Sequence, residues 1–200
     1  MYAPKLRELV EALRSLFSRP YTTRFPKGKY EPVKEYRGFP QFFEEDCVGC
    51  GTCYQVCPAG AIEMNDDIKK GVRVLKIDYS SCIQCGQCEE HCITERGIRI
   101  TTKYSVPIFS LSEDNYFNVI EKKLVKCEIC GKSFACEDHL HFIRKRLGAK
   151  SYAHPNLLIG LQKKLGSIPE AKYKGRIRRE DYIKEVCPIC RHKIVVEDEF

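Results

Sequence analysis

The sequence predicts an α+β protein in which a duplicated cysteine-rich unit lies between an N-terminal helix and a second cysteine-rich region. Residues 47–57 and 82–92 repeat one cysteine spacing at a distance of 35 positions (82 − 47 = 35). Residues 72–77 alternate between these runs as a strand does. Residues 4–17 carry apolar side chains at three- and four-residue steps, the pattern of an amphipathic helix. Two C-x-x-C pairs complete the chain, at 127–130 and 187–190.

The 13 cysteines restrict the class of protein more than any other feature of the composition. Extracellular cysteines form disulfides, but the first ten residues lack the apolar core of a signal peptide. The sequence also contains no apolar run as long as a membrane span. We therefore expect the thiols to lie in a reducing compartment, where grouped cysteines bind metal.

The formal charge of +7 suggests nucleic acid only if the metals are left out. A four-thiolate iron–sulfur or zinc site carries a charge of about −2. Two clusters and one zinc would leave +7 − 2 − 2 − 2, or about +1. Two basic stretches are expected to be solvated faces or subunit contacts, and no nucleic-acid partner is expected. They comprise Arg144, Lys145 and Arg146, and Arg176, Arg178 and Arg179.

The N-terminal segment, residues 1–45, is predicted to be an amphipathic helix followed by an extended docking arm. The helix is too short to span a bilayer, so its Leu-rich face should dock on a partner protein or lie at a membrane surface. The alternative is packing on the chain's own core. Prolines interrupt residues 19–45 and exclude a helix there.

The two cysteine runs indicate iron–sulfur clusters. Three cysteines at three-residue steps can hold three corners of a [4Fe–4S] cube, and in proteins with two such runs the fourth ligand is the last cysteine of the other run. The first cluster is thus assigned Cys47, Cys50, Cys53 and Cys92, and the second Cys82, Cys85, Cys88 and Cys57. A zinc site is the alternative interpretation of one such run. The expected dry shell comprises Val48, Val56, Ile62, Ile77, Ile83 and Ile98.

Residues 46–102, within a predicted segment 46–104, resemble a dicluster bacterial-type ferredoxin. With residues 19–26 and 36–38, the chain is similar to the two-cluster subunit of respiratory complex I and to its relatives in energy-converting membrane hydrogenases and formate hydrogenlyase. The resemblance implies an electron-transfer subunit without catalytic residues of its own. It also implies a peripheral position on the cytoplasmic side of the cell membrane, beside a [NiFe]-hydrogenase-like large subunit and a small iron–sulfur subunit. Ile93 departs from the family, which usually has proline there.

The last segment, 105–200, is predicted to be a linker helix over 112–124 and a zinc-ribbon-like helical extension. Two or three short helices are expected between 134 and 183, ending near Gly148 and Gly166. The paired C-x-x-C motifs indicate a four-thiolate site for Zn²⁺, or alternatively for a rubredoxin-like iron. Its ligands are Cys127, Cys130, Cys187 and Cys190. The remaining candidates are His139, His141 and His192, which could substitute as ligands, and Cys136, which is expected to be a buried thiol.

Two other classes of function compete with electron transfer. Paired C-x-x-C motifs and basic stretches also fit a zinc-ribbon protein associated with nucleic acid, with structural clusters. A self-contained sulfur or thiol reductase could use Cys136, although the sequence contains no Gly-rich dinucleotide fingerprint and no P-loop.

Overall fold

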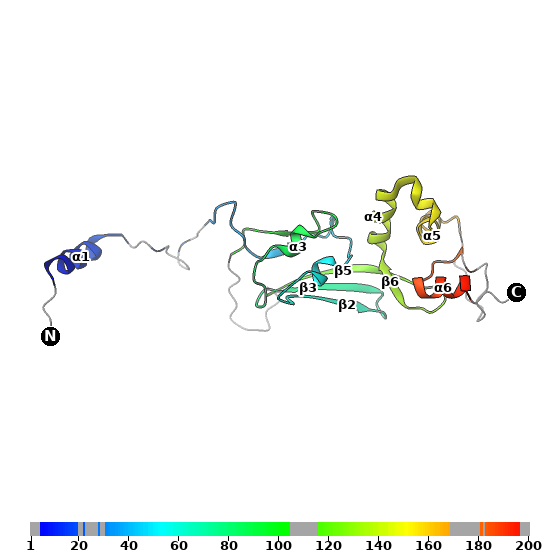
Figure 1. The fold of residues 1–200 in the computed structure, drawn as a ribbon, viewed down its shortest axis with the longest axis horizontal. Helices are drawn as coiled ribbons and strands as arrows, with labels where there is room; N and C mark the ends of the chain where they lie inside the picture. The colour runs from blue at the N-terminus through cyan, green and yellow to red at the C-terminus, as the bar shows by residue number, and fades with distance from the viewer. Residues whose placement is uncertain are drawn as a thin grey trace. The chain divides into compact units, whose positions relative to one another are not determined.

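The computed structural model describes residues 5–19, 22, 28, 31–104, 116–168, 181 and 183–196 (Figure 1). The chain divides into two compact units, residues 1–35 and residues 36–200.

The first unit contains helix α1, Leu6–Phe17. The carboxylate of Glu8 accepts a hydrogen bond from the backbone N–H of Lys5 at 3.2 Å, which satisfies a donor at the start of the helix. The apolar side chains of α1 are exposed, with Leu6 and Phe17 each 84% exposed. The predicted amphipathic helix is confirmed. Residues 20, 21, 23–27, 29 and 30 of the predicted arm lie outside the described residues, and residues 31–45 contain no helix.

The duplicated unit repeats a loop and a single helical turn. Helices α2, Thr52–Gln55, and α3, Gln87–Glu90, lie 35 residues apart, and each follows a glycine in the left-handed conformation, Gly51 or Gly86. Strands β1, Pro40–Phe42, and β4, Ile98–Ile100, pair antiparallel across the unit. The phenol of Tyr79 donates to the carbonyl of Pro40 at 3.1 Å.

A four-stranded antiparallel sheet runs through the second unit in the order β2-β3-β5-β6 (Figure 1). Its strands are β2, Ile62–Asp67; β3, Val72–Asp78; β5, Phe117–Lys126; and β6, Ser133–Cys136. The carboxylate of Asp67 accepts from the N–H groups of Lys69 and Lys70 and closes the turn between β2 and β3. The register places Leu75 of β3 opposite Ile120 of β5, so apolar side chains meet on the buried face.

Strand β5 contradicts the linker helix predicted over 112–124. Residues 112–115 lie outside the described residues, but 117–124 are in a strand. Ile120, Lys122 and Leu124 alternate inward along it, and β3 supplies a backbone edge for pairing, which outweighs the local helix propensity. The pairing joins residues on both sides of position 104 in one sheet.

The core of the duplicated unit mixes aliphatic side chains with thiols. Ile62, Ile77 and Ile98 are buried, as expected for the dry shell. Val48 and Val56 are only half-buried. Ile83 is 66% exposed, so its inclusion in the shell was wrong. It lies in the loop between Cys82 and Cys85, both of which are only partly buried.

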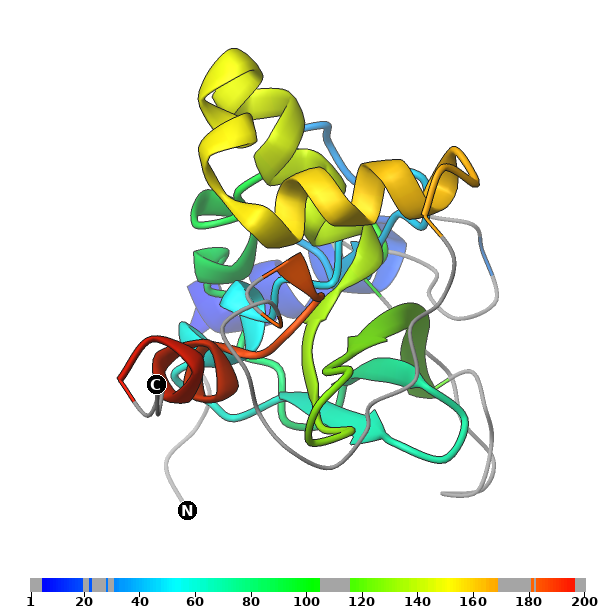
Figure 2. The same ribbon diagram turned by 90° about the vertical axis from the view of Figure 1, so that its right-hand side faces the viewer.

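The remaining elements follow β6. Helix α4, Glu137–Leu147, leads through the 3₁₀ helix η2, Gly148–Ala153, into α5, Pro155–Lys164, and α6 spans Pro188–Val196. Figure 2 shows α4 and α5 side by side, with α6 (red) to the left of the strands. Gly148 and Gly166 have positive φ at the helix ends, so these predicted stops are confirmed. No helix among the described residues is long and apolar enough to cross a membrane.

Candidate metal centres

Four thiols, three from the first run and one from the second, line a single cavity. They belong to Cys47, Cys50, Cys53 and Cys92. The loop bearing the first three turns through Gly49 (φ +68°) and Gly51 (φ +80°), backbone conformations that bring the cysteines together on one side. Leu75 and Ile98 line the same cavity and are 1% and 2% exposed. The structure therefore brings a soft, four-thiol donor set into a dry pocket.

Hydrogen-bond donors surround the sulfurs of this cavity. The Thr94 hydroxyl lies 3.3 Å from Cys92 Sγ, and the Thr52 hydroxyl lies 3.3 Å from Cys50 Sγ. Burial alone would raise the pKa of Cys92, but the Thr94 hydroxyl and nearby backbone N–H groups donate to its sulfur and lower it. Burial raises the pKa of Cys47 despite the N–H of Gly49. Donors aimed at sulfur favour thiolate, the form that binds metal.

The second group contains the other three cysteines of the second run and the last cysteine of the first. Burial raises the pKa of the Cys82 thiol, and its neighbours Cys57 and Cys85 raise it further. Burial likewise raises the pKa of Cys88 to about 11, where Cys82 and Cys85 again act in the same direction. Cys57 is thus close enough to Cys82 to raise its pKa across the repeat, as Cys92 is close enough to raise that of Cys47.

The two thiol groups lie close together. Burial raises the pKa of Cys53 to about 12, with contributions from Cys50, Cys47 and, across the repeat, Cys88. Cys53 and Cys88 both belong to the same buried core cluster and are 7% and 8% exposed. A neighbouring charge shifts a pKa appreciably only at short range. The inner members of the two donor sets therefore lie in one buried core.

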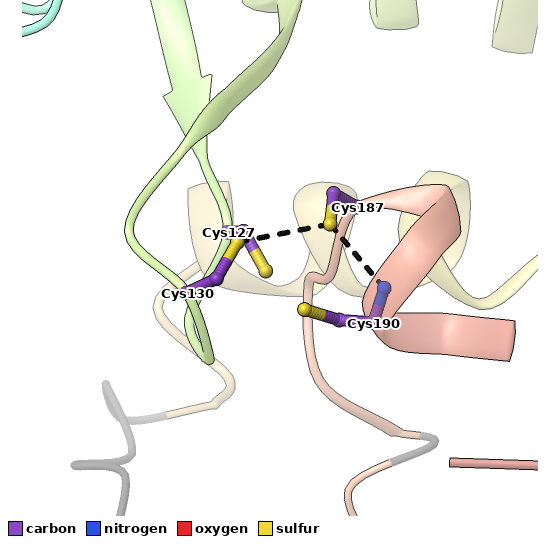
Figure 3. A group of neighbouring side chains, drawn as sticks. All are labelled: Cys127, Cys130, Cys187 and Cys190. Atoms are coloured by element: carbon purple, nitrogen blue, oxygen red, sulfur yellow. Dashed lines mark hydrogen bonds between the residues drawn. The ribbon is translucent and has the colours of Figure 1, made fainter. Parts of the chain in front are cut away.

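A third group consists of the four cysteines of the C-x-x-C pairs (Figure 3). Their sulfurs lie within 4.8 Å of one another, and three of the four residues are buried. Cys127 and Cys130 come from the turn between β5 and β6, whereas Cys187 and Cys190 come from the start of α6. Burial alone would raise the pKa of Cys127, but backbone N–H groups of Cys130, Cys187 and Ile129 lower it to about 7. Four converging thiols are the donor set of a closed tetrahedral site.

The two C-x-x-C turns have the same hydrogen bond. The N–H of Gly131 donates to the carbonyl of Cys127 at 2.9 Å, and the N–H of Arg191 donates to the carbonyl of Cys187 at 2.9 Å. Asn156 of α5 holds the second turn in place: its amide donates to the carbonyl of Val186 at 2.8 Å and accepts from the Val186 N–H at 3.3 Å. Lys163 bridges Glu128 and Glu185 beside the site.

None of the candidate histidines joins this group. Among the described residues, this third group contains the four cysteines alone. His141 lies 2.6 Å from the guanidinium of Arg144, and burial lowers the pKa of the half-buried His139. Cys136 is fully buried, as expected, and its thiol donates to the carbonyl of Gly49 at 3.3 Å.

Cations close to the first cavity were not anticipated from the sequence. Lys122 of β5 is 8% exposed, and its ammonium donates to the carbonyl of Glu44 at 2.7 Å and to Asp138 at 3.2 Å. Arg73 of β3 donates to the carbonyl of Gly49 at 3.0 Å and pairs with Asp66 at 2.7 Å. The sequence could have indicated this, because a strand over residues 117–126 places Lys122 between Ile120 and Leu124 on the inward face.

The comparisons with known proteins fit this arrangement. Residues 46–95 match the family described as "4Fe-4S dicluster domain". The chain is 32% identical over 106 residues to NAD(P)H-quinone oxidoreductase subunit I of Gloeobacter violaceus, a match covering 50% of each chain, so it spans only half of that relative's length. It is 23% identical over 174 residues to formate hydrogenlyase subunit 6 of Escherichia coli, covering 86% of this chain and 82% of that one.

A third relative is matched over most of its own length. The chain is 32% identical over 84 residues to pyruvate synthase subunit PorD of Methanothermobacter marburgensis, covering 42% of this chain and 86% of that subunit. A solved chain of the membrane-bound sulfane sulfur reductase, an archaeal respiratory membrane complex, superimposes with a TM-score of 0.41 at 31% identity, covering 57% of this chain and 61% of that one.

The duplicated cysteine runs and their fold define a two-cluster iron–sulfur protein. The chain belongs to the 4Fe–4S dicluster ferredoxin family, as the resemblance predicted, and its relatives are subunits of multi-subunit oxidoreductases, including NADH-quinone oxidoreductase subunit I and formate hydrogenlyase subunit 6.

Proposed function

We propose that this chain relays electrons through two [4Fe–4S] clusters inside a membrane-associated respiratory complex. The first cluster is held by Cys47, Cys50, Cys53 and Cys92, and the second by Cys82, Cys85, Cys88 and Cys57. One observation carries the proposal: the last cysteine of each run lies with the thiols of the other run. A zinc site formed by a single run would not require a cysteine from the other run.

Bound clusters supply one-electron chemistry, and the chain supplies position, insulation and charge. The side chains of Leu75, Ile77 and Ile98 exclude water from the thiol groups. The shared interior of Cys53 and Cys88 keeps the two groups close. The proposal assigns the chain no catalytic residue. Cys136, the thiol considered for a reductase, is fully buried, which speaks against contact with a substrate.

We further propose that the C-terminal cysteines hold a structural Zn²⁺, with iron as the alternative, in a zinc-ribbon-like extension. Converging thiols and matched backbone turns support a closed site. A metal at this site would connect α6 to the β5–β6 turn. The two parts are far apart in the sequence, with 57 positions from Cys130 to Cys187. We also propose a division into segments 1–45, 46–104 and 105–200, in which β5 of the last segment pairs with β3 of the middle one.

The proposed setting is the cytoplasmic side of the cell membrane, with the chain peripheral and bound to other redox subunits. The relatives in NADH-quinone oxidoreductase and formate hydrogenlyase support a complex of this kind. A [NiFe]-hydrogenase-like large subunit and a small iron–sulfur subunit are the proposed neighbours. The exposed apolar face of α1 offers a docking element for such a subunit or for the membrane surface.

Paired serine substitutions test the ligand sets. Anaerobically purified full-length variants would be reduced stepwise and followed by electron paramagnetic resonance. We expect Cys50→Ser and Cys92→Ser to alter the same cluster signal, and Cys57→Ser and Cys85→Ser to alter the other. Signals that group by run instead, with Cys92 affecting the cluster of Cys85, would overturn the assignment. Cys136→Ser is the matched control and should leave both clusters assembled.

A further inference from the structure

The carbonyl of Gly49, in the middle of the first cysteine loop, is held from outside by two side chains. Arg73 donates to it at 3.0 Å and Cys136 at 3.3 Å. The C=O and N–H of one trans peptide point in opposite directions. Holding the Gly49 carbonyl toward Arg73 therefore turns the N–H of Cys50 away from that side. Both donors come from outside the loop, one from β3 and one from the end of β6.

The side chain of Lys122 packs against the same loop. A Cβ added to Gly49 would lie 3.0 Å from Lys122 Cβ and 3.1 Å from its Cγ. The ammonium group is buried with the side chain, at 9% exposure, and its carboxylate partner Asp138 is 52% exposed. A buried cation with a single half-exposed anion is costly to desolvate. A second negative charge nearby would offset that cost.

Thiolates that hold a cluster in the first cavity would supply that second negative charge. Burial raises the pKa of Cys47, and Lys122 acts against it by favouring the thiolate. The hydrogen bond to Asp66 raises the pKa of Arg73 most, and Cys136 and, more weakly, Cys50 raise it further. The second thiol group has different surroundings. The main influences on Cys82 and Cys88 are burial, other thiols and backbone N–H groups. No lysine or arginine is among the main influences on the pKa of these two thiols.

We infer that Lys122, with Arg73, raises the reduction potential of the cluster at Cys47, Cys50, Cys53 and Cys92 above that of the other cluster. The inference rests on the proposed ligand sets. Reduction adds one electron to a cluster that already carries about −2 with its four thiolates. A nearby buried cation stabilises the added charge more than an exposed one, because the interior screens it less. At equilibrium the electron resides on the first cluster.

Redox titration of the two clusters in full-length Lys122→Met tests the inference, with Lys123→Met as the matched control. Lys123 is the next residue of β5, but its side chain is 78% exposed and pairs with Glu137. Lys122→Met should shift electron sharing between the clusters about tenfold away from the first, equal to about 59 mV for a one-electron couple. Lys123→Met should shift it less than twofold. Equal shifts in the two variants overturn the inference.

A second variant has the opposite sign. Asp138→Asn removes the anion beside Lys122 and lies at a half-exposed position that tolerates the change. It should raise the potential of the first cluster, which a loss of packing would not do; no change or a fall counts against the inference. If the unmodified chain assembles two clusters and these variants leave the potentials unchanged, this inference alone is wrong. If the chain assembles no such clusters, the proposed function fails first.

Discussion

Replacing Gly49 with alanine tests how tightly the first cysteine loop is packed. The residue has φ +68°, and an added Cβ would lie 2.8 Å from Cys136 Sγ and 3.0 Å from Lys122 Cβ. Neither neighbour can move into solvent, because they are 0% and 8% exposed. The left-handed conformation costs a non-glycine residue about 1–2 kcal/mol. Overpacking adds about 1–3 kcal/mol, for a total of roughly 2–5 kcal/mol.

Gly60→Ala separates the two contributions. Gly60 has φ +62° and no atom within 4 Å of the position its Cβ would take. It should therefore lose only the conformational part, about 1–2 kcal/mol. The second run contains a non-glycine residue at the equivalent position. Gln84 stands 35 positions after Gly49 and has φ 56°. Positive φ alone does not demand glycine there, so contact with Cys136 and Lys122 is the distinguishing cost.

The assay is the rate at which cluster absorbance is lost in guanidinium under anaerobic conditions, because cluster release makes unfolding irreversible. An extra 1–3 kcal/mol of native-state strain, lost as the loop opens, corresponds to roughly 5–150-fold. Gly49→Ala should release its clusters faster than Gly60→Ala by about that factor. Equal rates in the two variants would refute the packing argument. Adding Cys136→Ala to Gly49→Ala should recover part of the difference, since the nearest clashing atom is then gone.

Three further changes are informative. Leu75→Ala should lower the stability of the fold by about 2–5 kcal/mol and speed oxidative cluster loss, because Leu75 is 1% exposed in the first cavity. The control is Val119→Ala, at an exposed position of neighbouring β5, which should change thermal stability little. Similar melting temperatures for the two variants would contradict this prediction. Chelation of the metal proposed for the C-terminal cysteines, or Cys190→Ser, should accelerate amide exchange in 183–196 and leave β2 and β3 unchanged. Uniform acceleration would argue against a site that stabilises α6 locally. Asn156→Ala should lower stability by about 2–3 kcal/mol, since it leaves the buried backbone of Val186 unpaired, and an unchanged melting temperature would show that water replaces the amide.

The cysteine spacing carried most of the predictable information. A repeat of 35 positions with glycines before each short helix indicates two equivalent loops, and the structure has both. The α1 helix was predictable for a similar reason, since its periodicity is local. The stops at Gly148 and Gly166 followed from glycine at helix ends. All of these features are set by residues near one another in the chain.

The linker strand and the cation beside the first cavity could not be predicted in the same way. Residues 117–124 have helix-forming composition, and only pairing with β3 makes them a strand. Because a helix was predicted there, the inward position of Lys122 was missed. Lys122 faces inward only if the side chains of this segment alternate as they do in a strand. The exposure of Ile83 depended equally on the path of its loop. Each miss concerns a contact between distant parts of the chain.

The most direct test of the central claim is the iron and acid-labile sulfide content of the anaerobically purified chain, with electron paramagnetic resonance before and after reduction. Two cubes of four irons predict about eight Fe and eight sulfides per chain, 4 + 4 of each, with two reversibly reducible, mutually interacting signals. Zinc in place of iron in the two runs, or iron without labile sulfide, would contradict the account.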